Sequence, residues 1–150
     1  MAFDFRYATE SDIEQIVAIE EEAMSNPWNA MAYQEAISSD HAFIIVAEDS
    51  GTIAGFAVFY LTAPESELPD IVVSEEYRGH GIGKKLFAHS IEELKSKEID
   101  IIFLEVRVSN TPARHLYTSL GFEKIGRRKY FYSNPVEDAI CMRLDIEKDR

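Results

Sequence analysis

One glycine-rich segment constrains the fold of this chain more than any other part of the sequence. The segment reads Arg78-Gly79-His80-Gly81-Ile82-Gly83-Lys84 and lies between an expected strand and an expected helix of about residues 80–97. Glycines at the start of a helix let a ligand approach the backbone, where free N–H groups and the positive helix end bind phosphate. The spacing is neither that of a Walker loop nor that of the G-x-G-x-x-G dinucleotide motif. It indicates either a phosphate-binding loop, to which Arg78 and Lys84 add charge, or a turn of purely structural use.

Hydrophobic periodicity predicts a mixed α/β chain in which helices cover a central sheet. The predicted order is strand, two helices, three strands, helix, strand, helix, two strands. We expect strands at residues 3–7, 42–47, 52–61, 68–73, 101–108, 122–125 and 136–144, and helices that begin near Thr9, Asn29, His80 and Asn110. A long loop is expected between the last two strands. No linker or repeat divides residues 1–150, so we expect a single domain.

Composition and charge exclude several classes of function. The chain carries 27 Asp and Glu against 15 Lys and Arg, a net charge of -12, which argues against nucleic acid as a partner. Cys141 is the single cysteine, so neither an intrachain disulfide nor a cysteine-based zinc site is expected, and no histidine pair has a metal-ligand spacing. No segment is typical of a signal peptide or a membrane span, so we expect a cytoplasmic protein. We also expect a monomer without a metal.

A carboxylate interrupts one of the apolar expected strands. Glu105 lies within Ile101–Val106, which is apolar on both faces and is predicted to be buried on both sides. Burial raises the pKa of a carboxyl group, and a raised pKa suits a general base that works near neutral pH. The alternative is a salt bridge to Arg107, two residues along on the same face of the strand.

Tyr117 is the second candidate for proton transfer. It lies beside Ala113, Leu116 and Leu120 at helical spacing, which is typical of a packed core tyrosine. A hydroxyl at the inner end of such a helix can also donate a proton. Cys141, in an apolar strand, is expected to be a small core residue.

Taken together and in order, these segments resemble the GNAT superfamily of N-acetyltransferases over nearly the whole chain, and within it the RimI type, the ribosomal-protein-alanine N-acetyltransferases. The R-x-x-G-x-G loop and the L-Y-x-x-x-G-F helix carry the resemblance to the superfamily. The matching segments are Asn26-Pro27-Trp28, Asp70–Val73, Arg78–Gly83, Leu104–Asn110, Leu116–Phe122, Arg127–Phe131 and Glu137–Met142. The resemblance implies a single domain whose mostly antiparallel sheet splays into a V, flanked by about four helices.

The resemblance also implies roles for individual residues, with acetyl-coenzyme A as the acetyl donor. The expected cofactor-binding residues are Ile71, Val72 and Val73 for the pantetheine arm, Arg78, Gly79, His80, Gly81, Ile82, Gly83 and Lys84 for the pyrophosphate, and Asn110. Glu105 is then the general base and Tyr117 the general acid that protonates the departing thiolate. Trp28 and Tyr130 are expected to contact the acceptor, although Trp28 is equally suited to an aromatic staple of the first helix. Tyr130 is followed by Phe131, where the family often has a second tyrosine.

The sequence therefore predicts transfer of an acetyl group to the N-terminal α-amine of a protein, with a basic ribosomal protein as the expected acceptor. Direct attack of the amine on the thioester requires neither a protein nucleophile nor a metal. Two alternatives remain open. In the first alternative, the enzyme acetylates a small amine or a lysine side chain. In the second, the chain binds coenzyme A but catalyses no reaction.

Overall fold

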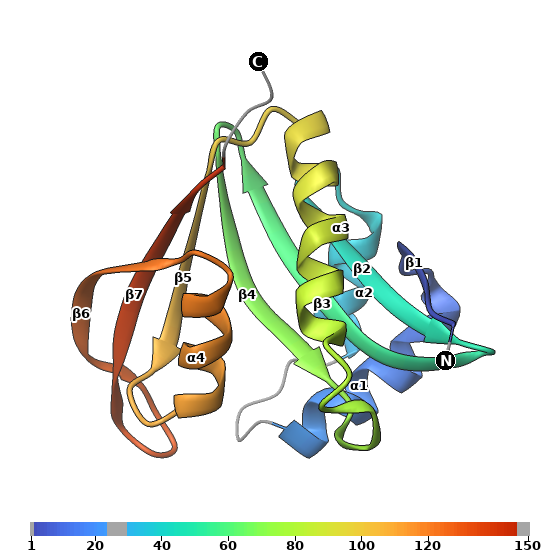
Figure 1. Ribbon diagram of the computed structural model, residues 1–150, viewed down its shortest axis with the longest axis horizontal. Coiled ribbons are helices and arrows are strands. Elements are labelled where there is room, and N and C mark those ends of the chain that lie inside the picture. Colours follow the sequence, from blue (N-terminus) through green and yellow to red (C-terminus); the bar gives the residue numbers. More distant parts are fainter. Residues whose placement is uncertain (1, 24–29, 147–150) are drawn as a thin grey trace.

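The computed structural model describes residues 2–23 and 30–146 of the chain. Within these ranges, seven strands form one sheet that four α-helices flank (Figure 1). The strands are β1 (Asp4–Tyr7), β2 (Ala42–Asp49), β3 (Thr52–Thr62), β4 (Glu65–Val73), β5 (Ile101–Arg107), β6 (Glu123–Tyr132) and β7 (Glu137–Asp145). The helices are α1 (Ile13–Ala23), α2 (Ala30–Ser38), α3 (Ile82–Ser96) and α4 (Thr111–Ser119). The predicted order of elements is confirmed.

The sheet separates two layers of helices. Its strand order is β1-β2-β3-β4-β5-β7-β6, and every neighbouring pair is antiparallel except β4 and β5. One hydrophobic cluster joins the sheet to α3 and α4 and includes Leu86, Leu104 and Tyr117. A second cluster joins the opposite face to α1 and α2 and includes Ile16, Tyr33 and Phe56. The mostly antiparallel sheet and its four flanking helices are as predicted. No helix in the described ranges is long and apolar enough to cross a membrane.

The parallel pair β4–β5 stays together over a short stretch only. Glu65–Glu67 pair with Ile101–Phe103, and beyond this point the two strands diverge (Figure 1). A bulge lies at the point of divergence, because Leu68 and Pro69 together lie opposite the single residue Phe59 of β3. Proline has no N–H to give to a neighbouring strand, and a bulge bends the strand that contains it. The predicted V is therefore present, with its mouth between the second half of β4 and β5.

Two expectations about the strands were wrong. In β5, side chains on the α3 and α4 side are buried, whereas Phe103 and Glu105 on the other face are half-buried. The cluster under α1 and α2 includes no described residue of β5, so no helix covers that face of the strand. The second wrong expectation concerns the strand predicted at residues 122–125. This strand continues as β6 to Tyr132, so a tight hairpin replaces the expected long loop. The hairpin closes because β6 accommodates a bulge of three residues, 129–131, opposite Asp138.

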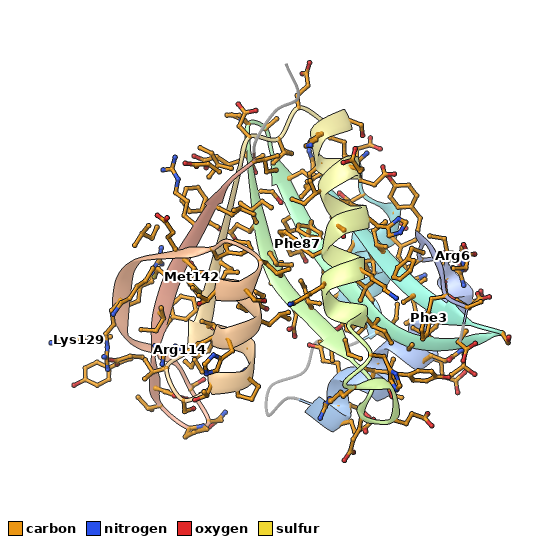
Figure 2. The ribbon with its side chains drawn as sticks, viewed as in Figure 1. Phe3, Arg6, Phe87, Arg114, Lys129 and Met142 are labelled. Carbon is orange, nitrogen blue, oxygen red and sulfur yellow. The ribbon has the colours of Figure 1, made fainter. Side chains whose placement is uncertain are left out.

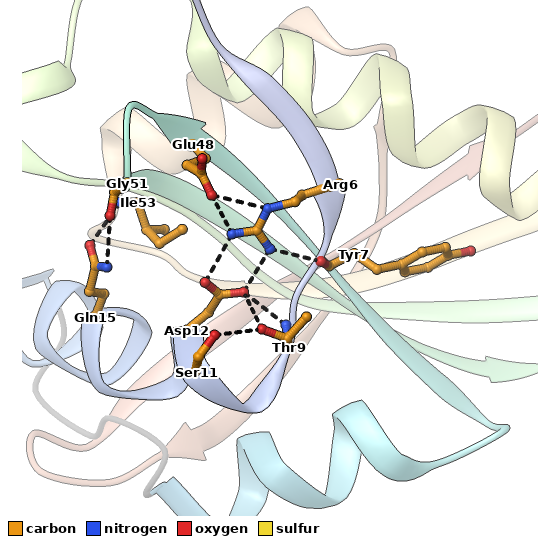
Figure 3. A network of polar contacts seen from close by, with 9 residues as sticks. All are labelled: Arg6, Tyr7, Thr9, Ser11, Asp12, Gln15, Glu48, Gly51 and Ile53. Carbon is orange, nitrogen blue, oxygen red and sulfur yellow. Dashed lines mark hydrogen bonds and ion pairs between the residues drawn. The ribbon is translucent and has the colours of Figure 1, made fainter.

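An ion-pair network ties the first strand to the first helix (Figure 3). The Arg6 guanidinium donates to Asp12 Oδ2 at 2.8 Å and to Glu48 Oε1 at 2.5 Å. Asp12 is 4% exposed and also accepts the backbone N–H of Thr9 at 2.8 Å, which caps the helical segment that leads into α1. The hydrogen bond from Arg6 holds the pKa of Asp12 below its ordinary value against the opposing effect of burial.

Replacing Arg6 by methionine should destabilise the fold by on the order of 2 kcal/mol, because Asp12 then stays buried without its cation. The folded-state pKa of Asp12 is lowered, so this contribution is present above about pH 4 and is lost as the pH falls through that lowered value. Urea denaturation at neutral and acidic pH measures the difference between the variant and the wild type. The control is Arg143→Met, which removes an exposed ion pair with Asp145 and should cost less than about 1 kcal/mol. Equal losses in both variants would contradict the prediction.

Candidate active site

The glycine loop leads from the end of β4 into α3. Gly79 and Gly81 have φ angles of +87° and +72°, in the left-handed region that favours glycine. Gly81 is the N-cap of α3 and has no side chain to bond the first N–H groups of the helix. A Cβ built on Gly79 or on Gly81 would meet no described atom within 4 Å, so open space lies in front of the loop. The loop therefore offers backbone donors and a helix N-terminus to an anion.

The charged residues of the loop are exposed, whereas Ile82 and Gly83, which follow Gly81, are buried. Arg78, His80 and Lys84 are all exposed, and Arg78 Nε donates to the carbonyl oxygen of Val73 at 3.2 Å. Ile82 is buried in the core, and a Cβ on Gly83 would lie 3.5 Å from Leu116 of α4. Gly83 thus allows α3 and α4 to approach each other, while the charged side chains remain available to a ligand.

Ile71, Val72 and Val73 line the mouth of the V on the β4 side. They pair with β3 on one edge, and their other edge faces the gap because the pairing with β5 ends at Glu67. Backbone groups along a strand edge bind an extended ligand as another strand would. This unpaired edge of β4 therefore suits an extended ligand that carries amide groups.

Tyr117 of α4 lies in the core, and its hydroxyl reaches the gap. The side chain is 4% exposed, and its ring packs edge-on against Phe122 at 5.8 Å between centroids. The hydroxyl group meets the backbone N–H of Ile71. Burial raises the pKa of Tyr117 far above its ordinary value, the charge of Asp70 adds to this, and the Ile71 amide opposes it. The hydroxyl is therefore protonated at neutral pH, and the ring packs in the core as one interpretation of the sequence expected, while the role of Tyr117 as a proton donor stays a prediction.

Glu105 of β5 is the carboxylate on the other side of the gap. Burial raises its pKa above the ordinary value, Glu67 raises it further, and Arg128 opposes them. Arg128 Nη2 lies 3.8 Å from Glu105 Oε1, the distance of a loose ion pair. The alternative pairing with Arg107 is wrong, because that guanidinium bonds Glu137 at 3.2 Å instead. The raised pKa that the sequence suggested for a general base is present.

Tyr132 is a residue of the site that sequence reasoning missed. Its hydroxyl interacts electrostatically with Glu105 and with Asp70, and its ring stacks under the Arg107 guanidinium at 4.5 Å. It reaches this place because the β6 bulge shifts the strand against β7. Asp138 holds the bulge, accepting the N–H of Tyr130 at 2.9 Å and the Arg127 Nε at 2.7 Å. The signal in the sequence was Tyr132 itself, one place after the Phe131 that departs from the family pattern.

Asp70 is a second residue that was missed as a candidate. It follows the bulge in β4, and its Oδ2 atom is buried with no hydrogen-bond partner among the described residues. Burial raises its pKa to about 8, the charge of Glu20 adds to the rise, and the Ile71 N–H lowers it. An acidic residue between Pro69 and an apolar run carries the same sequence signal that singled out Glu105.

The remaining predicted residues lie in different places. Asn110 is the N-cap of α4, and its Oδ1 accepts the Ala113 N–H at 3.2 Å. Tyr130 lies on the outer side of the β6 bulge and is 77% exposed, near Lys129, which points into solvent (Figure 2). Trp28 lies outside the described residues. Cys141 is half-buried opposite Glu105, so the expectation of a core position was wrong.

Comparison with known proteins shows the family of this chain. The model of the acetyltransferase (GNAT) family matches residues 13–122. The chain belongs to the GNAT family. The [ribosomal protein bS18]-alanine N-acetyltransferase of Escherichia coli K12 is 32% identical over 138 residues, 91% of this chain and 93% of that protein. The N-alpha-acetyltransferase RimI of Mycobacterium tuberculosis is 31% identical over 143 residues, 91% of this chain and 89% of that protein.

Solved structures agree with the family. The crystal structure of the Escherichia coli ribosomal-protein-S18-alanine N-acetyltransferase superposes with a TM-score of 0.88 at 29% identity, covering 99% of this chain and 97% of that one. The chain is thus a GNAT N-acetyltransferase, and this family uses acetyl-coenzyme A. The open space before Gly79 and Gly81 fits a pyrophosphate, and the free edge of β4 fits an extended pantetheine arm.

Replacing Gly81 by valine should weaken the binding of acetyl-coenzyme A by this GNAT enzyme at least tenfold, because the side chain fills the open space before the loop. The matched control is Gly51→Val in the β2–β3 turn, where φ is +91° and a Cβ likewise meets no described atom within 4 Å. Both variants carry backbone strain of about 1–2 kcal/mol. Titration calorimetry of both, with thermal melts to establish folding, measures the difference. Unchanged affinity in folded Gly81→Val would refute the phosphate-binding role of the loop.

Proposed function

We propose that this GNAT enzyme transfers the acetyl group of acetyl-coenzyme A to the N-terminal α-amine of a protein. The observation that carries the proposal is the approach of two proton-transfer groups to the mouth of the V. Tyr117 from α4 presents a protonated hydroxyl beside the Ile71 amide, and Glu105 from β5 presents a carboxylate of raised pKa. A general acid and a general base beside one gap are what direct acyl transfer requires.

In this proposal, the gap and the glycine loop hold the acetyl donor. The residues from Arg78 to Lys84 bind the pyrophosphate through backbone N–H groups and positive charge. Ile71, Val72 and Val73 hold the pantetheine arm, and Asn110 contacts the donor from the start of α4. A backbone amide beside the β4 bulge stabilises the oxyanion of the tetrahedral intermediate. This arrangement brings the thioester to the Tyr117 hydroxyl.

Glu105 and Tyr117 then move the protons of the reaction. An α-ammonium group has a pKa of about 8, so a modest base is sufficient to expose its lone pair. Glu105 takes this proton through a water molecule, and the amine attacks the thioester carbon. When the C–S bond breaks, Tyr117 gives its proton to the departing thiolate. The raised pKa of Glu105 supports its role, because it brings this group nearer to neutral pH, and Tyr117 is protonated at neutral pH and so has a proton to give.

A basic ribosomal protein is the proposed acceptor. The bS18-alanine N-acetyltransferase of Escherichia coli, 32% identical to this chain, supports the assignment by its name. Glu67 and Glu105 give the acceptor side a negative potential that favours an α-ammonium group, and the net charge of -12 favours a basic partner. Trp28 and Tyr130 are proposed as contacts for the acceptor peptide.

A paired assay with purified protein and acetyl-coenzyme A tests this function. One arm offers peptides that copy the N-termini of ribosomal proteins, and the other offers polyamines, aminoglycosides and a lysine peptide with a blocked N-terminus. Thiol release with the first arm, and acetyl on the α-amine by mass spectrometry, are the expected results. Release in the second arm alone would move the acceptor class. Silence in both arms, with acetyl-coenzyme A still bound, would favour a binding module without catalysis.

Glu105→Gln should lower kcat/KM at neutral pH by about a hundredfold and leave acetyl-coenzyme A affinity within twofold, since the amide cannot accept the proton. Two neighbouring variants provide a sharper test of the pH profile. The acidic limb, on which the rate rises as Glu105 loses its proton, should move to lower pH in Glu67→Gln and to higher pH in Arg128→Gln. These signs follow because Glu67 raises the pKa of Glu105 and Arg128 lowers it. Limbs that stay in place in both variants would remove Glu105 from the mechanism.

Tyr117→Phe should reduce kcat by about a hundredfold with little change in the melting temperature, because the ring still packs against Phe122. The matched control is Tyr7→Phe, which removes a surface hydroxyl that donates to Glu93 of α3. That control should keep the wild-type rate. A folded Tyr117→Phe enzyme with a wild-type rate would show that the tyrosine serves packing alone.

A further inference from the structure

Asp70 is a half-buried residue whose carboxyl group the proposed mechanism has not used. It lies immediately after the β4 bulge, where β4 turns away from β5. Its Oδ2 atom is closed to solvent and has no hydrogen-bond partner among the described residues, while the Ile71 N–H contacts the carboxyl group. A buried carboxylate without a cation is costly, and such a group is held as the neutral acid. Asp70 can therefore act as a hydrogen-bond and proton donor.

Within residues 2–23 and 30–146, the groups that face Asp70 come from three elements, and none of them is a cation. Glu20, which is 2% exposed, faces it from α1, Tyr117 from α4 and Tyr132 from β6. Its partner in β3 is the apolar Val58. Glu20 raises the pKa of Asp70 and thereby favours its protonated form. Asp70 and the Tyr117 hydroxyl also share the Ile71 N–H, which brings the acid and the phenol to one point of β4.

We propose that Asp70 is a positioning residue that acts through Tyr117, holding its hydroxyl at the Ile71 amide and replacing the proton that Tyr117 gives to the thiolate. Glu20 serves this role by keeping the carboxyl group in its acid form. The inference rests on the proposed acetyl transfer and adds a proton source to it. It concerns a carboxyl group on β4, whereas the proposed base lies on β5.

The protons and electrons of this step balance. The C–S bond of the tetrahedral intermediate breaks, its electron pair stays on sulfur, and sulfur takes the proton of the Tyr117 hydroxyl. The phenolate oxygen takes the proton of the Asp70 acid, and water restores that acid after the products leave. The acceptor ammonium group loses two protons in each turnover. The sulfur atom gains one proton, so one proton in total is released to solvent. No group is oxidised or reduced.

The direction of the pH dependence follows from the charge of Asp70. Its pKa is raised to about 8, so the donor form predominates at neutral pH and is lost above that value. The ionised form has no proton to give, and its charge opposes a phenolate at Tyr117. The wild-type kcat should therefore fall on a basic limb near the pKa of Asp70.

The experiment compares the wild type with Asp70→Asn, Glu20→Gln and the exposed control Asp40→Asn, using the acceptor found in the paired assay. Asp70→Asn, which keeps the shape but carries no transferable proton, should lower kcat by about tenfold to a hundredfold and leave KM for acetyl-coenzyme A within about twofold. Its basic limb should disappear. Glu20→Gln should move that limb to lower pH, and Asp40→Asn should match the wild type. Asp70→Asn should melt no lower than the wild type above neutral pH, because it removes a buried charge.

An infrared measurement tests the same inference without turnover. The difference spectrum of wild type minus Asp70→Asn should contain a carboxylic acid band at about pH 6 that is lost by about pH 10. Absence of that band at the lower pH would show an ionised Asp70 and overturn the inference whatever the activity. A wild-type kcat and pH profile in Asp70→Asn would overturn it as well. Failure of the wild type to acetylate any amine would instead refute the proposed function, which the paired assay detects first.

Discussion

The early end of the β4–β5 pairing is the constraint on which the rest of the site depends. Parallel strands normally continue side by side, but here Pro69 has no N–H to offer and the bulge bends β4 away from β5. Each side of the gap gains from this separation. β4 keeps a free backbone edge, and β5 keeps Glu105 only half-buried. Without the separation, β5 would occupy the edge that the thioester arm is proposed to use.

Electrostatics in the gap follow from the same separation. The gap brings carboxyl groups of β4 and β5 close to each other, and Arg128, at 3.8 Å, opposes the rise in the Glu105 pKa only in part. Asp70 faces a further carboxyl group in α1. Desolvation and like charge thus act in one direction on both carboxyl groups. This contrasts with Asp12, where the hydrogen bonds from Arg6 outweigh burial and lower the pKa.

Sequence patterns were sufficient for most of the fold and for part of the site. The glycine loop could be found by its closely spaced glycines and Glu105 by its charge within an apolar strand, whereas Tyr117 follows the core spacing of its helix and only its hydroxyl set it apart. The partner of Glu105 could not be found, because Arg107 shares its face in sequence terms while Arg128 arrives from β6 through hairpin register. Tyr132 was missed for the same reason, since the bulge at residues 129–131 changes which side chain faces the gap.

Because of the bulge in β6, the position of a residue in the sequence does not by itself give the face of the hairpin on which its side chain lies. Side chains alternate between the two faces of a strand, so one inserted or deleted residue exchanges the face that each neighbour occupies. In this chain, Asp138 fixes the inserted residues by binding the Tyr130 amide and the Arg127 guanidinium. A length change of one residue between Arg128 and Tyr132 would therefore present Phe131 or Ser133 to Glu105 without any substitution. Hairpin length, as much as residue identity, is a variable through which related enzymes can diversify this side of the site.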